Sequence, residues 1–315
     1  MARENRTTNT SQVTRLVHSA LKQKGYAAKI VSISHLDDLK EEINRHHNQG
    51  VLDEALYQAY LAGFEFGIPA NFPDAKSLVI TSVPHPQQRV NFNFKGRSYH
   101  LTVPPTYSHE TDKIVENILS DILKPKGFNL YPAAVPQKLL AVRSGLAKYG
   151  KNNITYIEGM GSFYRLKTFL SDLPTIEDIW FESQLLEQCN TCDAGVKECP
   201  TDAIVPHRFL IQAEQCLTFH NERPNEFPDW IKLSWHNCLI GCMVCQLACP
   251  ANKRFFNWFE EEGSFTEEET ELILKGTSPK QLPHATVEKL EKFYLLDQMD
   301  VIPRNLDVLI KQGSS

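Results

Sequence analysis

Eight cysteines crowded into 61 residues constrain this chain more than any other feature of its sequence. They lie between positions 189 and 249, and two stand directly before proline, in Cys199-Pro200 and Cys249-Pro250. Short C-x2-C and C-x3-C-P loops are typical of bacterial-type ferredoxins, where each loop wraps one cluster and the Cys-Pro ligand reaches the other. The pattern therefore predicts two [4Fe-4S] clusters and the passage of electrons through this segment. The expected ligands are Cys189, Cys192, Cys199, Cys216, Cys238, Cys242, Cys245 and Cys249.

Zinc and disulfide bonds are the alternative uses of these cysteines. All-thiolate zinc sites also use C-x2-C pairs, but zinc does not account for two Cys-Pro pairs. Disulfides persist in oxidising compartments. The first residues lack the apolar core of a secretory signal, and no apolar stretch approaches the ~20 residues that span a bilayer. We therefore expect a cytoplasmic protein with reduced thiols and no membrane partner.

The charge of the chain argues against a nucleic acid as an obvious partner. Its formal net charge is -5, and residues 251–315 hold eight Lys or Arg against twelve Asp or Glu. Proteins that bind nucleic acids usually present a basic field, so only a local basic groove would remain for such a partner.

The patterning outside the cysteines predicts an α+β fold in three parts. Residues 1–181 contain no cysteine and carry helix, hairpin and crossover signals, which favours an α+β over a strictly doubly wound domain. A ferredoxin-like domain is expected at 182–253. Residues 254–315 are expected to form a short helical tail, in which Thr266-x-x-Glu269 predicts a capping box.

Individual elements of residues 1–181 can also be predicted. Ser11 is a candidate N-cap for a helix that ends at Gly25, and the continuous apolar run at 77–83 predicts a central strand. The other expected elements are strands at 27–34 and 128–134, a hairpin of 90–94 with 98–103, and helices at 36–46, 52–64, 114–122 and 137–144, the last closed by Gly145.

The first cysteine loop lacks one ligand. The register C-x2-C-x2-C-x3-C-P places Gly195 where a third cysteine is expected, whereas Cys238 is surplus to the second loop. The economical hypothesis is that Cys238 supplies the missing ligand. The two sets would then be Cys189, Cys192, Cys238 and Cys249 for one cluster, and Cys199, Cys216, Cys242 and Cys245 for the other. The alternative is a three-iron or water-ligated cluster with Cys238 as an inert buried thiol.

Several motifs in the same order along the chain resemble those of epoxyqueuosine reductases. They include Gly241-Cys242-Met-Val-Cys245-Gln-Leu-Ala-Cys249-Pro-Ala-Asn252, and Gln215-Cys216-Leu-Thr before it. Upstream, Ser144-Gly-Leu-Ala-Lys-Tyr-Gly-Lys-Asn152 and Gly161-Ser162-Phe-Tyr-Arg-Leu match two further stretches of that family. The matches cover roughly residues 130–252. The family is related to reductive dehalogenases.

The resemblance implies a cobalamin cofactor, which the residues alone would not have indicated. In the family the corrinoid is bound base-off, without a lower protein ligand, between the N-terminal domain and the clusters. The N-terminal domain would thus be of a corrinoid-binding type. The positions that match the family and are expected to contact the cofactor are Lys151, Asn152, Gly161 and Ser162. The bland alternative for the Gly159-Met-Gly161 stretch is a simple turn.

Tyr131 marks the main departure from the family. A carboxylic acid that is thought to protonate the substrate is expected at this position, and the chain has tyrosine instead. A phenol, with a reference pKa near 10, can donate a proton but needs a neighbouring cation to do so readily, for which Lys151 is a candidate. Reductive dehalogenases also use a tyrosine. The alternative is that Tyr131 only packs against the core.

The sequence thus predicts an oxidoreductase in which clusters pass single electrons to a corrinoid, which reduces a small electrophile such as an epoxide or a halide. An external low-potential donor of flavodoxin or ferredoxin type is expected. The substrate would be a small molecule or nucleoside; tRNA is compatible with the resemblance but not favoured by the acidic tail. The rival interpretation is an iron–sulfur electron-transfer protein without corrinoid.

Overall fold

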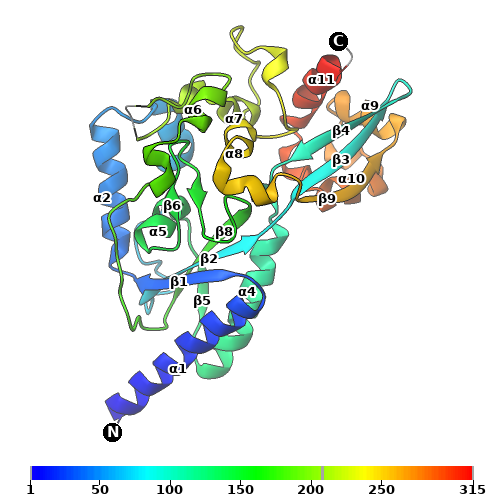
Figure 1. Cartoon of the computed structure of the whole chain (residues 1–315). Helices are drawn as coiled ribbons and strands as arrows, with labels where there is room; N and C mark the ends of the chain where they lie inside the picture. The colour runs from blue at the N-terminus through cyan, green and yellow to red at the C-terminus, as the bar shows by residue number, and fades with distance from the viewer. Residues whose placement is uncertain (1, 207–208, 314–315) are drawn as a thin grey trace. The chain divides into compact units, whose positions relative to one another are not determined.

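The computed structural model describes residues 2–206 and 209–313, and they form two compact units (Figure 1). The first unit comprises Met1–Pro84 and His109–Cys192, and the second comprises His85–Ser108 and Asp193–Ser315. Among the described residues, none of the helices combines the length and the hydropathy needed to cross a membrane.

A four-stranded antiparallel sheet forms the centre of the first unit. Its strand order is β1 (Ala27–Ser32), β2 (Ser77–Pro84), β8 (Tyr164–Ser171), β5 (Leu130–Pro132). Every residue of β2 except Pro84 is buried, as expected for a continuous apolar run in a central strand. β1 is an edge strand, with β2 as its one neighbour in the sheet.

Two helices cover one face of this sheet. α1 (Ala2–Gln23) and α4 (Glu110–Leu123) pack on each other; α1 also contacts β1, and α4 contacts β2 and β8. Their apolar residues recur three or four apart and meet the sheet residues that point to the same face. This core contains Val13, Val17, Leu21, Val79, Val115, Leu119, Leu123 and Phe169. The short α5 (Gln137–Arg143) packs on β2 and β8 as well.

The remaining elements of the first unit are short, apart from α2 (His35–Asn48). A two-stranded hairpin joins β6 (Lys148–Tyr149) to β7 (Thr155–Tyr156). The others are α3 (Glu54–Leu56), the π-helix η1 (Tyr57–Leu61), and the 3-10 turns η3 (Lys124–Lys126) and η4 (Glu187–Asn190).

The second unit is built on a three-stranded sheet of order β4 (Arg97–Val103), β3 (Gln87–Phe94), β9 (Phe259–Phe265). β3 and β4 form a hairpin whose two turn residues, Lys95 and Gly96, both have positive φ, as a tight hairpin turn requires. β9 lies parallel to β3 although some 170 residues separate them in sequence. Helices α9 (Glu267–Leu274), α10 (His284–Lys292) and α11 (Ile302–Gly313) complete one hydrophobic core with this sheet.

The cysteine segment of the second unit consists of single helical turns. These are α6 (Ala194–Glu198), η5 (Ala213–Gln215), α7 (Leu217–Asn221), η6 (Leu233–Trp235), α8 (Val244–Leu247) and η7 (Pro250–Phe255). The other 3-10 turns of this unit are η2 (Pro105–Tyr107), η8 (Pro279–Gln281) and η9 (Leu296–Gln298). Leu239 and Ile240, which immediately precede the second loop, are buried in the core shared with β3, β9 and α11.

The structure confirms the α+β fold and most of the predicted elements. The central strand, the hairpin, the helices near 114–122 and 137–144 and the capping box of Thr266 with Glu269 are all present. Gly145 closes α5 with φ +73°. The boundaries of the strand near 128–134 shorten to Leu130–Pro132.

Two expectations for the helices were wrong. Ser11 is not an N-cap, because α1 begins nine residues earlier, at Ala2. The helix expected at 52–64 is reduced to α3 and the π-helix η1, and neither has a buried residue, so no core face holds a longer helix there.

The two units also differ from the predicted domains 1–181, 182–253 and 254–315. Residues 85–108 belong to the second unit because β3 pairs with β9. The predicted tail joins the same unit because α9, α10 and α11 share its core with the hairpin. The first unit extends to Cys192, so that the boundary falls inside the first cysteine loop.

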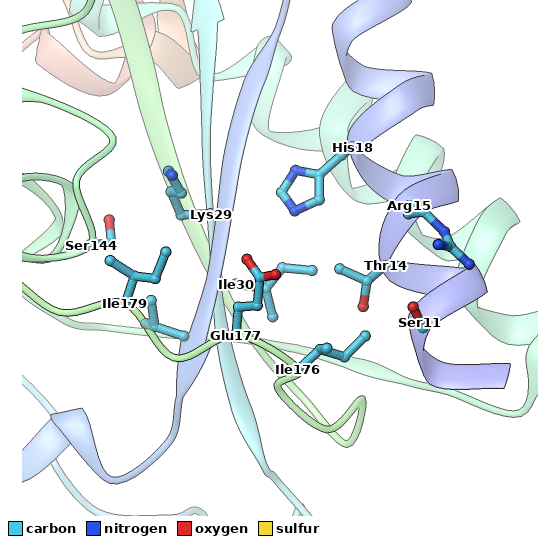
Figure 2. A pocket seen from close by; sticks show the side chains of 11 residues that line it. Ser11, Thr14, Arg15, His18, Lys29, Ile30, Ser144, Ile176, Glu177 and Ile179 are labelled. Atoms are coloured by element: carbon cyan, nitrogen blue, oxygen red, sulfur yellow. The ribbon is translucent and has the colours of Figure 1, made fainter. Parts of the chain in front are cut away.

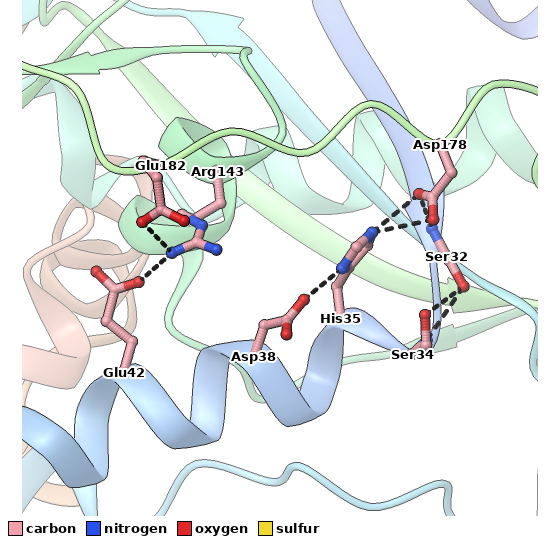
Figure 3. Close-up of polar contacts among 8 residues, drawn as sticks. All are labelled: Ser32, Ser34, His35, Asp38, Glu42, Arg143, Asp178 and Glu182. Carbon is pink, nitrogen blue, oxygen red and sulfur yellow. Dashed lines mark hydrogen bonds and ion pairs between the residues drawn. The ribbon is translucent and has the colours of Figure 1, made fainter.

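A buried ion pair inside the first unit leads to a stability prediction. Arg143 on α5 bonds Glu42 on α2 at 2.7 Å and Glu182 at 3.3 Å (Figure 3), and the exposed fraction of the side chain is 7% for Glu42 but 86% for Glu182. Glu42→Gln should lower the free energy of unfolding by about 3 kcal/mol, because it removes the buried carboxylate from the Arg143 guanidinium and leaves the exposed Glu182 as its anionic partner. Glu182→Gln, the matched control, should cost less than about 1 kcal/mol. Urea unfolding measures both; equal losses would contradict the prediction.

Candidate functional site

Three of the predicted ligands in the second unit, Cys199, Cys216 and Cys242, lie close enough for their thiols to interact electrostatically. Cys199 follows α6, Cys216 immediately precedes α7, and Cys242 stands just before α8. The first turn of α7 directs the backbone amides of Thr218 and Phe219 at the Cys216 sulfur. All eight cysteines of the chain are free thiols, so the structure contains no disulfide.

Burial governs the protonation of these thiols. It raises the pKa of Cys242 to about 11 and raises that of Cys216 as well, while nearby N–H donors act in the opposite direction. In the metal-free protein both groups are therefore thiols. Iron binding must displace their protons, and the amides of α7 and α8 are placed to stabilise the sulfur charge once it forms.

Asn237 organises the sulfurs around the second loop. Its side-chain N–H donates to Cys242 Sγ at 3.2 Å, while its oxygen accepts from the Met243 amide at 2.8 Å and from Cys238 Sγ at 3.2 Å. Burial, followed by the proximity of Cys242, raises the pKa of Cys238 well above its usual value. Sequence reasoning missed Asn237, and the one signal that could have found it is its position directly before the surplus Cys238.

Tyr107 lies near the thiols of Cys238 and Cys216. Its hydroxyl donates to Glu222, and burial together with that carboxylate raises the tyrosine pKa well above its usual value. Gly241, with φ +67°, is required here because a Cβ would stand 2.6 Å from the Tyr107 hydroxyl. Contact with Tyr107 thus explains why the position before Cys242 is a glycine.

Gly195 and Cys238 do not occupy the same place in the second unit. A Cβ on Gly195 would lie 3.9 Å from Cys245 Cβ and from Ile204 Cδ1, in ordinary van der Waals contact. Cys238 instead lies beside Cys242. Cys245 is on α8 and Cys249 precedes η7. The structure thus puts Cys238 next to a thiol of the set predicted for the other cluster, and its role as the replacement ligand stays a prediction.

Cys189 and Cys192 belong to the first unit, where the turn η4 positions them. The Cys189 amide donates to Leu186 O, and the Cys192 amide donates to Gln188 O. Lys151 Nζ donates to the Cys192 carbonyl at 3.2 Å. The lysine predicted as a corrinoid contact therefore also fixes the backbone of a predicted cluster ligand.

Asn152 stabilises the turn of the β6–β7 hairpin. Its amide donates to the Tyr156 hydroxyl at 2.9 Å, and its oxygen accepts from the Ile154 amide at 3.2 Å. Gly150 is needed beside it, since a Cβ there would come within 2.5 Å of the Asn152 oxygen. Asn152 thus shapes the loop that presents Lys151.

The Gly159–Ser162 stretch forms a tight turn between β7 and β8, as the alternative interpretation predicted. The Ile157 amide donates to Gly161 O, and Gly159 and Gly161 both have positive φ. Around the position of a Gly159 Cβ nothing lies within 4 Å, so the backbone there is open to close approach. Ser162 is buried at 7% exposure.

Tyr131 lies on β5 and is half-buried. Asn71 donates from its side-chain nitrogen to the Tyr131 hydroxyl at 3.2 Å, and the ring of Phe72 stacks on Tyr131 with centroids 5.8 Å apart. Because the phenol oxygen accepts from Asn71, its own proton is left for donation to another group. Asn71 is 60 residues away in sequence, and no pattern pointed to it.

Comparison with known proteins confirms the predicted resemblance. Residues 188–252 match the family model of the 4Fe-4S double cluster binding domain, which supports two [4Fe-4S] clusters. The epoxyqueuosine reductase of Atelocyanobacterium thalassa is 33% identical over 123 residues, 38% of this chain and 39% of that protein. That of Cellulophaga algicola is 24% identical over 247 residues, 73% of this chain and 78% of that protein.

Solved structures extend the likeness to nearly the whole fold. An epoxyqueuosine reductase from Bacillus subtilis has a TM-score of 0.67 and 21% identity, covering 96% of this chain and 82% of that one. Another, solved with an epoxyqueuosine-modified tRNA-Tyr stem loop, has a TM-score of 0.67 and 20% identity, covering 96% and 81%. The chain therefore has the fold of epoxyqueuosine reductases, while its match to the first of these relatives spans under half of that protein's length.

Proposed function

We propose that this chain is an iron–sulfur reductase that passes single electrons through two [4Fe-4S] clusters to a cobalamin, at which a small electrophilic substrate is reduced. The observation that carries the proposal is the cysteine arrangement: eight free thiols at double-cluster spacing, three of them close enough to interact, in a chain with the epoxyqueuosine reductase fold. The soft thiolate donors of this segment suit iron–sulfur clusters.

The first unit supplies residues that fit a corrinoid. The open backbone at Gly159 and the Lys151 ammonium, held on a turn shaped by Asn152, suit the amide and phosphate groups on a corrin periphery. Gly161 and Ser162 complete the predicted contacts. A bound cobalamin would supply the metal centre at which the substrate is reduced, in base-off form as in the family it resembles.

Tyr131 is proposed as the proton donor. Deoxygenation of an epoxide to an alkene consumes two electrons and two protons and releases water, whereas removal of a halide consumes two electrons and one proton. Asn71 orients the phenol by donating to its oxygen, so that the hydroxyl proton is directed elsewhere. An external donor of flavodoxin or ferredoxin type would supply the electrons one at a time.

The substrate is proposed to be a small molecule or a nucleoside with an epoxide, a halide or a similar reducible group. The solved relative with a tRNA stem loop makes a tRNA-borne epoxide the first substrate to test. The acidic residues of the second unit weaken that choice, because affinity for nucleic acids depends on cationic contacts to phosphate.

Cobalamin binding is the deciding experiment. Full-length protein reconstituted with iron and sulfide should retain cobalt after gel filtration with added cobalamin, and the corrinoid spectrum should shift to that of the base-off form. No retained cobalt and an unchanged spectrum would overturn the reductase proposal and leave the alternative, an electron-transfer protein without corrinoid. The samples with and without added cobalamin should contain the same amount of iron–sulfur cluster, so that any difference reports on corrinoid binding and not on cluster content.

Lys151 gives a prediction for the cluster that Cys192 is expected to ligate. Lys151→Met should lower the reduction potential of this cluster by roughly 40 mV. The reduced cluster carries one more negative charge than the oxidised one, and the variant loses a nearby positive charge that stabilises it by about 1 kcal/mol. An EPR-monitored redox titration measures the shift. Lys275→Met, which removes an exposed charge in the second unit, is the control. Equal potentials in the two variants would show that the ammonium does not act on the cluster.

A further inference from the structure

The first unit contains a cavity of about 310 Å³ along the outer edge of its sheet (Figure 2). Its walls come from the edge strand β1, from one face of α1 and from residues 176–179. The residues that matter here are Thr14, His18, Ile30, Ile176, Glu177 and Ile179. None of them has a role in the function proposed above.

The strand edge beside this cavity carries unpaired backbone groups. The Ile33 N–H donates to Lys76 O, and in an antiparallel pair the backbone groups of every second residue face the neighbouring strand. The backbone N–H and C=O of Ile30, three residues before Ile33, therefore point away from β2. Ser32, which points the same way, donates its amide to Asp178 Oδ1 at 2.8 Å (Figure 3). Among the described residues, the outward N–H and C=O of Ile30 have no such partner, although Ile30 is only 7% exposed.

Side chains around the cavity add further polar groups. Thr14 Oγ1 is buried and makes no hydrogen bond among the described residues. Burial, with a smaller effect from Lys29, lowers the pKa of His18, so its imidazole is neutral near pH 7. Glu177 lines the same cavity as Ile30 and Ile176 (Figure 2). Buried polar groups without partners are costly, and a polar molecule in this space would supply Thr14 Oγ1 with a hydrogen-bond partner.

The size of the cavity and the polar groups around it indicate which class of polar molecule fits. Asp178 already occupies the Ser32 amide, so the free edge is too short for an added peptide strand. The outward N–H and C=O of Ile30 together match a cyclic amide, whose C=O can accept from the Ile30 N–H while its N–H donates to the Ile30 C=O. Glu177 can accept hydrogen bonds from a sugar diol, and Ile176 and Ile179 offer apolar surface to a ring.

We propose that this cavity is a nucleoside-binding site, in which the amide edge of a nucleobase pairs with the backbone of Ile30 and Glu177 binds the ribose hydroxyls. Thr14 would donate a further hydrogen bond to the sugar. The site goes beyond the proposed reductase function, because its residues are separate from the cysteines, from Tyr131 and from the predicted corrinoid contacts.

Calorimetric titration of the full-length, cluster-loaded protein with inosine tests the site. Inosine should bind, and 1-methylinosine, in which a methyl group blocks the donor of the amide edge, should bind at least about tenfold more weakly. Glu177→Gln should weaken inosine binding about tenfold, whereas Glu158→Gln, an exposed acid of the same unit, should not change it. Thr14→Val, of nearly equal volume, should weaken it severalfold.

Absence of inosine binding, equal binding of the methylated nucleoside, or an unchanged affinity in Glu177→Gln would each overturn this proposal. Because the titration involves neither cobalamin nor electron transfer, its failure would leave the reductase proposal untouched. Conversely, a protein that fails to retain cobalamin can still show the predicted inosine binding.

Discussion

Cys238→Ser is expected to lower the iron content by about half, from about eight to about four atoms per chain. If Cys238 completes the cluster whose loop lacks a cysteine at Gly195, serine cannot hold that iron as tightly as a thiolate. Reduction of substrate should then fall below detection, since the electron path loses one of its two centres. Iron and sulfide analysis with EPR spectra of the reduced protein measures the change.

A second substitution makes this prediction sharper. Gly195→Cys in the Cys238→Ser background restores the regular C-x2-C-x2-C-x3-C-P loop, and it should return the iron content to that of the unaltered protein. The structure permits it, because a Cβ at position 195 meets no atom closer than 3.9 Å. If Cys238→Ser alone keeps all its iron and its spectrum, Cys238 is an inert buried thiol bonded to Asn237.

Tyr131→Phe is expected to reduce turnover by about 10²- to 10⁴-fold while leaving iron content and cobalamin binding unchanged. The phenylalanine keeps the stacking on Phe72 but removes the proton donor, and general acid catalysis contributes on this scale. Asn71→Ala should have a smaller effect, about tenfold, because it removes only the hydrogen bond that orients the phenol.

The control for this series is Tyr26→Phe, which removes a hydroxyl from a partly buried tyrosine on the α1–β1 side of the same unit. It should retain full activity. Steady-state turnover and single-turnover reduction, measured on samples with matched iron and cobalt content, separate a chemical role from a loss of cofactor. Full activity in Tyr131→Phe would remove this residue from the mechanism and leave it a strand aromatic.

The sequence predicted those elements whose pattern is local. The apolar run of β2, the turn residues Lys95 and Gly96 and the capping box at Thr266 each carry their signal within a few residues. β8 was missed because Arg165 and Lys167 interrupt its apolar pattern. The structure accommodates both charges by pairing them with Asp112 of α4, more than 50 residues away.

β9 was missed for a similar reason. Its sequence, Phe-Glu-Glu-Glu-Gly-Ser-Phe, has an acidic centre and no strand alternation, and its partner β3 lies far away along the chain. The pairing follows from tertiary packing, in which Phe265 stacks on Phe92 in the core. No local pattern reports such a partner.

In the candidate site, too, features with a local sequence pattern were predicted and features that depend on tertiary contacts were not. Cysteine spacing predicted the cluster segment because ligation imposes its own register along the chain. The residues that orient the reactive groups, Asn71 beside Tyr131 and Asn237 between two sulfurs, are single polar residues in loops. Their roles depend on contacts that only the folded chain creates.

The pairing of β3 with β9 sets the order in which the second unit can be completed during synthesis. Residues 85–108 leave the ribosome early, yet their sheet lacks a strand until Phe265 has been made. The backbone around the second cysteine loop is completed later still, because the Asn305 side chain on α11 donates to the carbonyls of Asn221 and Leu239. Iron can therefore meet a complete second unit only after Asn305 has been translated, more than 50 residues after the last cysteine of the segment.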